Sequence, residues 1–231
     1  YRKNFVSAAI PQINVGSTSP NDAETGGSAS ESAYNNFFGR LNYDFKSKYL
    51  LEFLFRYDGS QIFPEGKRFG FFPAVSAGWR LSEESFIKDN LPFVSELKLR
   101  GSYGELGNDR VPAYQYLQAF QFGNNYVFGG ITTPGIYSSR LPNPDITWEV
   151  SKKLDFGLEA ALWNRLLGVE LTIFNETRSN ILLQPVLSVS HVFGFPALPA
   201  QNIGEVNKHG YELTLTHINT IVELTYSVNA N

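Results

Sequence analysis

Few residues of this chain are spaced for catalysis or for holding a metal ion. The chain has 231 residues, no cysteine and three histidines, so thiol catalysis, disulfides and thiolate metal sites are excluded. His191, His209 and His217 lack the spacing of a zinc-binding pair. We therefore expect loop or strand-end histidines, and the sequence predicts no metal site and no bound cofactor.

The glycine-rich stretches also lack the spacing that binds a nucleotide phosphate. A phosphate loop has four residues between its first glycine and a Gly-Lys-Ser/Thr triplet. Here six residues separate Gly59 from Gly66, and Arg68 follows Lys67. The net charge of −3 gives no electrostatic reason to expect nucleic acid as a partner.

Two adjacent carboxylates, Glu83 and Glu84, come nearest to a general acid and base. Side chains adjacent in sequence point apart, however, and Ser82 before two acidic residues is typical of a capped helical turn. A solvated helix cap is the preferred interpretation. We predict no catalytic residue and no enzyme activity.

Aromatic side chains in one long loop are the best candidates for binding a ligand. Aromatic rings stack on sugar rings and on apolar side chains, and loops at the surface of a scaffold commonly carry binding residues. Packing of these rings against one another within the loop is the alternative interpretation. The candidates are Tyr114, Tyr116, Phe120, Phe122, Tyr126, Phe128 and Tyr137.

Apolar and polar residues alternate with a period of two along almost every informative stretch, which predicts strands with one apolar face. Between residues 34 and 45, for example, Phe37, Leu41 and Tyr43 share one face, and Arg40 and Asp44 share the other. Eight strands are predicted in this way, at 34–45, 51–57, 75–81, 97–103, 148–162, 167–178, 211–216 and 222–229.

The connections between these strands alternate in length. Those at 46–48, 82–96, 163–165 and 217–219 are tight or moderate and fall at one end of an up-and-down sheet. Those at 59–70, 105–145 and 182–207 are long, rich in Gly, Pro, Asn and Ser, and fall at the other end. Such a meander, with bulky aromatic residues near the strand ends, is typical of an outer-membrane barrel. Residues 1–33 have the composition of a further long loop.

The predicted fold is therefore all-β, as an antiparallel up-and-down transmembrane β-barrel. One alternative is a soluble carbohydrate-binding β-sandwich, whose strands alternate in the same way because their apolar faces pack on each other. The other is an enzyme on a β scaffold. Alternation alone does not separate a barrel from a sandwich.

Short motifs recur in order between residues 34 and 213, and in this order the chain resembles the SusC-like (RagA-type) TonB-dependent outer-membrane transporters of Bacteroidetes. One departure follows Ser60, where Gln61-Ile62 replaces the family's usual Ser-Arg before Phe63. The motifs are Phe38-Gly39-Arg40-Leu41-Asn42-Tyr43, Lys48-Tyr49-Leu50-Leu51, Arg56-Tyr57-Asp58-Gly59-Ser60, Gly70-Phe71-Phe72-Pro73-Ala74, Gly78-Trp79-Arg80, Leu97-Lys98-Leu99-Arg100-Gly101-Ser102-Tyr103-Gly104, Gly107-Asn108, Asn143-Pro144-Asp145-Ile146-Thr147-Trp148-Glu149, Asn202-Ile203-Gly204 and Gly210-Tyr211-Glu212-Leu213.

The resemblance implies a 22-stranded barrel in the bacterial outer membrane, of which this chain would supply about eight strands. Residues 1–33 would form an extracellular loop, and residues 34–231 would form barrel strands with long extracellular loops at 59–70, 105–145 and 182–207. The implied function is import of large nutrients, either oligosaccharides or peptides. The implied partners are a SusD-like surface lipoprotein, outer-membrane lipid, and TonB acting through a plug region that is not expected within this chain.

Overall fold

The computed structural model describes residues 19, 21, 29–185 and 198–231. The chain divides into two compact units, Tyr1–Ala33 and Tyr34–Asn231. The loop expected at 1–33 lies almost entirely outside the described residues. No helix among the described residues is long and apolar enough to cross a membrane.

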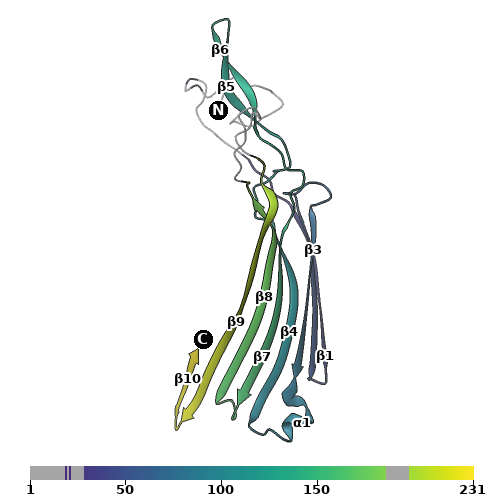
Figure 1. Ribbon diagram of the computed structural model, residues 1–231, viewed down its shortest axis with the longest axis vertical. Coiled ribbons are helices and arrows are strands. Elements are labelled where there is room, and N and C mark those ends of the chain that lie inside the picture. Colours follow the sequence, from purple (N-terminus) through teal and green to yellow (C-terminus); the bar gives the residue numbers. More distant parts are fainter. Residues whose placement is uncertain (1–18, 20, 22–28, 186–197) are drawn as a thin grey trace. The chain divides into compact units, whose positions relative to one another are not determined.

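The described part of the second unit is built almost entirely of strands (Figure 1). Eight of its strands form one sheet in the order β1-β2-β3-β4-β7-β8-β9-β10, and β5 and β6 pair only with each other. The elements are β1 (Tyr34–Phe45), β2 (Tyr49–Ser60), β3 (Phe69–Arg80), the 3-10 helix η2 (Leu81–Glu83), α1 (Ser85–Lys88), β4 (Val94–Asn108), β5 (Ala119–Phe128), β6 (Ile131–Arg140), β7 (Glu149–Leu162), β8 (Leu167–Leu183), β9 (Gln201–Ile221) and β10 (Leu224–Ala230).

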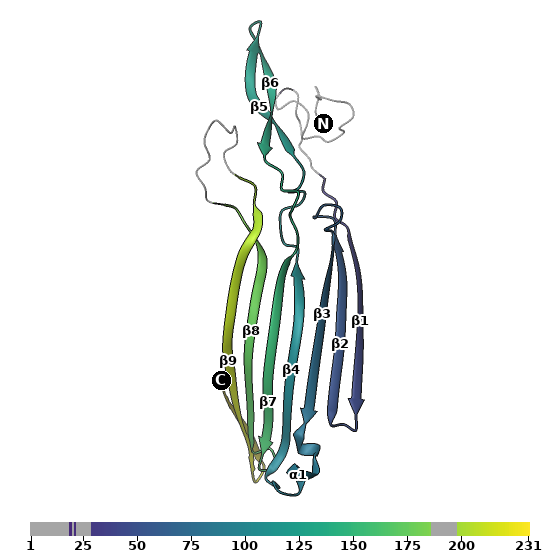
Figure 2. The ribbon, with the colours of Figure 1, turned by 45° about the vertical axis from the view of Figure 1, so that its right-hand side comes forward.

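All neighbours in the large sheet are antiparallel, and Figure 2 shows the strands lying side by side in chain order. The predicted eight-stranded, up-and-down arrangement is therefore confirmed. The sheet is curved but open, because β1 and β10 lie at its two edges and each pairs with a single neighbour. An open sheet with two bare edges is what part of a larger barrel leaves.

The connections lie at the two ends of the sheet as expected, although the eight-residue connection at 61–68 is shorter than the 13-residue one at 81–93. The ones at 46–48, 81–93, 163–166 and 222–223 lie at one end of the sheet, which we call the short-turn end. The ones at 61–68 and 109–148 lie at the opposite end, where β8 also ends at Leu183 and β9 begins at Gln201, and we call it the long-loop end. Because every pairing is antiparallel, the segregation follows from the chain order of the strands.

Several strands are longer than the sequence predicted. β4 runs to Asn108 and pairs there with Glu149, while β8 and β9 remain paired as far as Leu183 and Gln201. The connection expected at 182–207 is shorter for this reason, whereas the one expected at 105–145 runs from 109 to 148, keeps nearly the same length and contains the hairpin β5–β6. Apolar alternation ends before the backbone ladder does, since ladder hydrogen bonds do not depend on side-chain polarity.

The turns at the short-turn end correct two further predictions. The turn expected at 217–219 lies inside β9, and Ile221 pairs with Leu224 across a two-residue turn. Val222 in this turn has a φ of 56°, a value common in tight hairpins. Ser82 was expected to cap a helical turn, but it is buried within η2, and neither η2 nor α1 has a side-chain cap.

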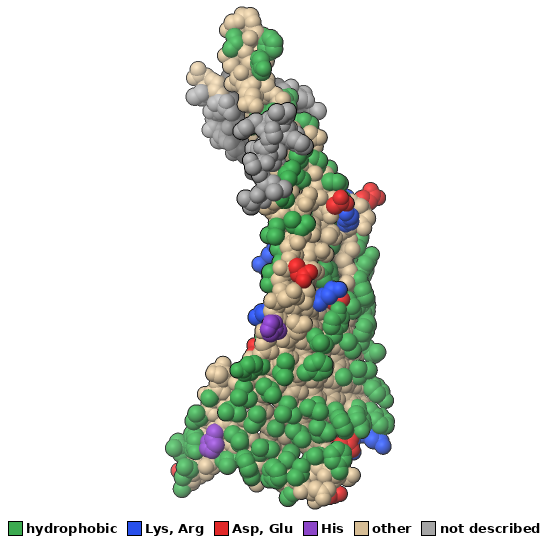
Figure 3. Space-filling view, in the orientation of Figure 1, with side chains coloured by type: hydrophobic (Ala, Val, Ile, Leu, Met, Phe, Trp, Pro, Cys, Tyr) green, Lys and Arg blue, Asp and Glu red, His purple; other side chains and the backbone are tan. Residues whose placement is uncertain are grey.

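The strand register gives the sheet two chemically different faces. One row of apolar side chains crosses five strands through the pairs Leu41–Phe53, Phe53–Val75, Val75–Tyr103 and Tyr103–Leu154. We call the face that carries this row the apolar face and the opposite one the polar face. Every member of the row is at least 37% exposed. Figure 3 shows hydrophobic side chains gathered over the lower part of the strands, and charged side chains mainly beyond them.

The apolar face has no second layer of protein upon it in the part of the chain that the structure describes. The buried hydrophobic side chains there are confined to Phe63, Phe72, Ile146 and Trp148, which we call the rim cluster. In a β-sandwich, the apolar rows would be packed in a dry interior between two sheets. The exposed rows disfavour that alternative.

Candidate functional site

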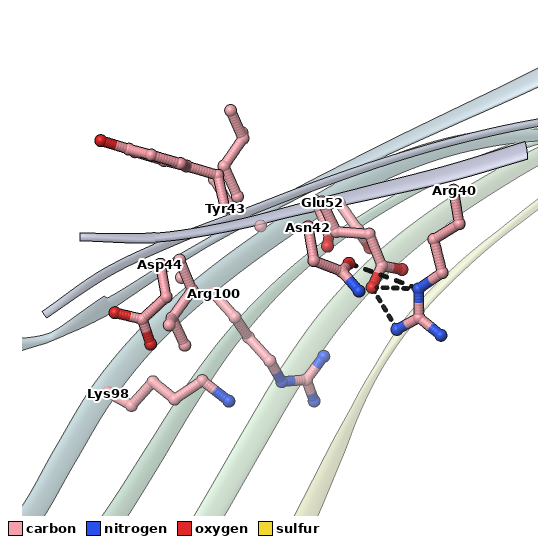
Figure 4. A pocket seen from close by; sticks show the side chains of 14 residues that line it. Arg40, Asn42, Tyr43, Asp44, Glu52, Lys98 and Arg100 are labelled. Atoms are coloured by element: carbon pink, nitrogen blue, oxygen red, sulfur yellow. Dashed lines mark hydrogen bonds and ion pairs between the residues drawn. The ribbon is translucent and has the colours of Figure 1, made fainter. Parts of the chain in front are cut away.

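The polar face is hollowed near the short-turn end. A depression of about 530 Å³ opens over β1, β2, β3 and β4, with Asn42, Lys98 and Arg100 among its lining residues. Figure 4 shows Asn42 and Arg40 on one side of β1 and Tyr43 on the other, as strand alternation requires. Small residues on β3 and β4, such as Ser76 and Ser102, form part of the lining.

An ion pair borders this depression on β1 and β2. Arg40 donates from Nε to Glu52 Oε2 at 2.9 Å and contacts the same oxygen through Nη2. The Arg40 and Glu52 side chains are 59% and 34% exposed. Ion pairs this open to water contribute little to stability, so this pair orients the two side chains more than it holds the strands together.

Arg100 on β4 connects three strands across the polar face. Its Nε lies 2.9 Å from Glu159 Oε1 on β7, and its Nη2 donates to Glu170 Oε1 at 3.0 Å and to Thr172 Oγ1 at 2.7 Å on β8. Its register partner is Gly157, where an added Cβ would lie 2.6 Å from Arg100 Cζ. The absence of a side chain at Gly157 lets the guanidinium cross β7 to reach β8.

The polar face has no arrangement of metal ligands in the described residues, where no group of three or more His, Asp or Glu side chains is placed to hold a metal ion. His209 and His217 both lie on β9, and His191 lies outside the described residues. The chemistry that this surface offers is ionic and hydrogen-bonding contact with a solute, supplied by paired charges.

The rim cluster holds the long-loop end together. The rings of Phe63 and Trp148 have centroids 5.0 Å apart, and those of Phe72 and Trp148 are 5.4 Å apart with edge-to-face geometry. Trp148 Nε1 also donates to the Arg68 carbonyl at 3.3 Å. Ile62 packs against this cluster, so the Gln61-Ile62 departure from the family pattern leaves Phe63 fully buried.

Hydrogen bonds fasten two further family motifs beside the rim cluster. Thr147 N donates to Asn202 Oδ1 at 3.0 Å, and Asn202 Nδ2 donates back to the Thr147 carbonyl at 3.0 Å. Asn143 Nδ2 donates to the Ala200 carbonyl at 2.6 Å. The motifs at 143–149 and 202–204 thus meet in space, beside Phe72 of the motif at 70–74, and support the loops. Their spacing in the sequence did not reveal this common location.

The structure separates the aromatic residues predicted to bind a ligand. Tyr114 and Tyr116 lie between β4 and β5, where Tyr116 packs against the rim cluster. Phe120, Phe122, Tyr126 and Phe128 lie on β5, and Tyr137 lies on β6.

A register shift between Gly123 and Tyr126 changes which face of the hairpin the later β5 residues occupy. Phe122 therefore pairs with Ile136 on one face, whereas Phe128 pairs with Ile131 on the other. The rings of Tyr126 and Phe128 stack at 6.0 Å. The five predicted residues of the hairpin therefore lie on its two opposite faces.

Glu84 has a role that sequence reasoning missed. Its carboxylate accepts hydrogen bonds from Lys48 Nζ at 2.9 Å, Tyr49 Oη at 2.8 Å and Trp79 Nε1 at 3.1 Å. The bond from Lys48, then those from Tyr49 and Trp79, lower the pKa of Glu84 from 4.5 to about 2. Glu83 pairs instead with Lys88 at 2.7 Å. Glu84 stands at the N-cap position of α1, as expected, but its side chain is not solvated and ties the β3–β4 connection to β2.

Comparisons with known proteins agree with this fold. The family model described as TonB dependent receptor-like, beta-barrel, matches residues 1–231. TonB-dependent receptor P26 of Formosa agariphila is 36% identical over 183 residues, which cover 79% of this chain and 18% of that protein. TonB-dependent receptor SusC of Bacteroides thetaiotaomicron is 33% identical over 187 residues, which cover 78% of this chain and 18% of that protein.

Solved structures show the same relationship. The chain superposes on a chain of the RagAB peptide transporter with a TM-score of 0.72 and 28% identity, covering 94% of this chain and 23% of that one. The siderophore receptor PirA of Pseudomonas aeruginosa shares the fold, with a TM-score of 0.55 and 16% identity over 87% of this chain and 34% of that one. This chain spans about 18% of the length of the curated relatives that it matches. Because the family model matches from the first residue to the last, the chain belongs to the TonB-dependent receptor β-barrel family and is a segment of a SusC-like barrel.

Proposed function

We propose that this chain forms part of the wall of a TonB-dependent nutrient importer in the bacterial outer membrane. The observation that carries the proposal is the contrast between the two faces of one sheet. Apolar side chains such as Phe156 and Ile173 are 60% and 56% exposed on one face, while ion pairs such as Arg100–Glu170 cover the other. Lipid would contact the first face, and solute would pass along the second.

The same arrangement supports an orientation in the membrane. In outer-membrane barrels, short turns face the periplasm and longer loops face outside. The short-turn end would therefore be periplasmic, and the loops within 59–70, 105–145 and 182–207 would be extracellular, as would the segment 1–33. The work done would be physical transport: the loops capture the solute, TonB acts on a plug, and the polar face admits the solute.

The proposed partners and substrates follow from the family. A SusD-like surface lipoprotein would cover the long loops, and TonB would act through a plug contributed by another part of the transporter. Oligosaccharides or peptides would be the cargo, since relatives include SusC and a peptide transporter, RagAB. We assign first contact with the cargo to aromatic residues of the β5–β6 hairpin and of the segment between β4 and β5. These residues are Tyr114, Tyr116, Phe120, Phe122, Tyr126, Phe128 and Tyr137.

Spin labelling of the full-length transporter in lipid bilayers tests the two faces. In a full-length variant from which any other cysteine has been removed, single cysteines at Phe156 and Ile173 would report on the apolar face, and cysteines at Asn42 and Glu170 on the polar face; this chain contributes none of its own. We expect labels at Phe156 and Ile173 to collide with lipid-soluble oxygen much more than with a water-soluble nickel chelate. Labels at Asn42 and Glu170 should show low oxygen contact. Equal oxygen contact on both faces would contradict the proposal.

A further inference from the structure

A second depression, of about 310 Å³, lies on the polar face nearer to the long-loop end than the first. Its walls come from β2, β3, β4 and β7, which all have neighbours on both sides in the sheet. Two small residues that are register partners, Ala74 and Gly104, form its floor, and a Cβ on Gly104 would lie only 3.2 Å from Ala74 Cβ. The depression is at the lower end of the size range of ligand pockets.

Aliphatic side chains line the second depression although it lies on the polar face. Leu106 on β4 is 66% exposed, and Leu54 on β2 is the register partner of Ala74. Leu54, Ala74 and Leu106 therefore form one apolar patch across three adjacent strands. Single exposed apolar side chains are common on protein surfaces, but a contiguous apolar patch with a polar border indicates a binding surface.

The charges around this patch balance. Each charged residue that lines the second depression belongs to an ion pair, and the pairs are Arg40–Glu52, Arg56–Asp58, Lys152–Glu105 and Lys153–Asp155. A charged ligand would have to displace an existing partner, whereas an uncharged ligand would not. Arg56 and Lys153 still have N–H groups that can donate to a carbonyl oxygen. The balance therefore favours an uncharged ligand with hydrogen-bond acceptors.

The lining separates the two classes of cargo. Phe72 lines the second depression, but it is only 4% exposed because its ring packs in the rim cluster. Tyr103 also borders the depression, but strand alternation places its ring on the apolar face, in the row with Val75. Sugar rings bind by stacking on open aromatic rings, whereas an aliphatic lining suits an aliphatic side chain.

A packed plug is the other candidate occupant of this depression. The cores of protein–protein interfaces are depleted of charged residues, but five charged residues line the second depression. The side chains of Arg56 and Lys153 remain 51% and 49% exposed. This composition favours a hydrated solute over a tightly packed protein segment.

We propose that Leu54, Ala74 and Leu106 form a subsite for an aliphatic side chain of a peptide that moves along the polar face. The inference rests on the proposed function and selects peptides from its two classes of cargo. The aliphatic side chain would lie over Ala74 and Gly104, and Arg56 and Lys153 would donate hydrogen bonds to carbonyl oxygens of the peptide backbone. A subsite that holds one side chain binds weakly enough for release, as conduction requires.

Binding of matched peptides to the full-length transporter tests the subsite. The probes are the tetrapeptides Gly-Leu-Gly-Gly and Gly-Asn-Gly-Gly, whose variable side chains are similar in size, and maltotetraose as an uncharged oligosaccharide. We expect wild type to prefer the leucine peptide about tenfold, as partial burial of one leucine side chain would give. L106Q should remove most of this preference, and L106M, which keeps an apolar side chain, should retain it.

Leu50 supplies the matched control for Leu54, because both lie on the polar side of β2 but Leu50 lines the first depression and not the second. L54Q should reduce the preference for the leucine peptide, and L50Q should leave it unchanged. An equal loss in L50Q and L54Q, or equal binding of the two peptides by wild type, would overturn the subsite. An unchanged preference in L106Q would also overturn it, and a lowered melting temperature of that variant would then assign the depression to the plug.

The oligosaccharide distinguishes failure of the subsite from failure of the proposed function. If maltotetraose bound wild type and neither peptide did, the subsite alone would be overturned. If none of the three probes bound, the subsite and the proposed function would both be overturned.

Discussion

The ring of Phe72 lies over Gly107, so close that a Cβ on that glycine would stand 2.0 Å from Phe72 Cζ. Phe72 lies beyond the last register pair between β3 and β4, Ala74–Gly104. The contact therefore joins the two strands where their backbone pairing has ended. The ring cannot easily move away, because it also lies against Gly70 and against Trp148, whose ring centroid is 5.4 Å from its own.

G107A should destabilise the long-loop end by about 1–3 kcal/mol, the usual cost of inserting a methyl group into a packed site. The thermal unfolding of the detergent-solubilised, full-length transporter measures the effect. G78A is the matched control, because the nearest atom to an added Cβ at Gly78 is 3.5 Å away. Adding F72L should recover part of the stability lost in G107A; equal losses in G107A and G78A would count against the contact.

R100Q should cost about 1–2 kcal/mol, because it removes the ion pairs to Glu159 and Glu170 and the hydrogen bond from Nη2 to the buried Thr172. The more exposed Arg40 provides a comparison, and R40Q should cost less than about 0.5 kcal/mol. Chemical denaturation of the folded barrel, followed by tryptophan fluorescence, measures both. If R40Q lost as much stability as R100Q, the network across β4, β7 and β8 would contribute no more than an exposed ion pair does.

Stability should depend on Glu84 at low pH. Its pKa is lowered from 4.5 to about 2 in the folded protein, so the carboxylate contributes stability above pH 4.5. That contribution should be lost as the pH falls from about 4.5 towards 2. The melting temperature of wild type should therefore exceed that of E84Q at pH 7, and the two should converge as the pH approaches 2. A constant difference over this range would exclude titration of Glu84 as the cause.

The two faces of the β5–β6 hairpin should contribute unequally to substrate binding, because one solute stacks on one face at a time. The double variants F120A/F122A and Y126A/F128A remove the aromatic side chains from opposite faces. We expect one of them to weaken binding by about 2- to 10-fold per lost ring, the range that corresponds to 0.5–1.5 kcal/mol of stacking. Titration of the full-length transporter with a bound oligosaccharide or peptide measures the change. If neither variant weakened binding, the hairpin would not be part of the binding site.

The strands were predictable because their alternation is regular. Phe37, Leu41 and Tyr43 identified one face of β1, and Phe53 and Val75 continued the same row on β2 and β3. The turns predicted at 46–48 and 163–165 match two of the short connections in the structure. The strand ends were less predictable, because the ladder from β8 to β9 continues to Leu183 through residues that do not alternate.

The sequence showed which residues of the polar face are charged, but it did not show which of them form ion pairs with one another. Glu170 lies 70 positions from Arg100 in the sequence, and no local pattern pairs them. The same holds for Glu84 and Lys48, which are 36 positions apart. Glu84 was therefore expected to be solvated, although its carboxylate has three donors in the structure.

The sequence by itself determined the fold class and the two faces of the sheet, because side chains alternate on any strand whatever its neighbours are. It also determined the family, through short motifs kept in order. Only the tertiary structure decided where the motifs at 143–149 and 202–204 meet, which aromatic residues share a face of the hairpin, and which carboxylates Arg100 reaches. The physical reason is that register between strands distant in sequence, together with one extra residue in β5, sets which side chains become neighbours.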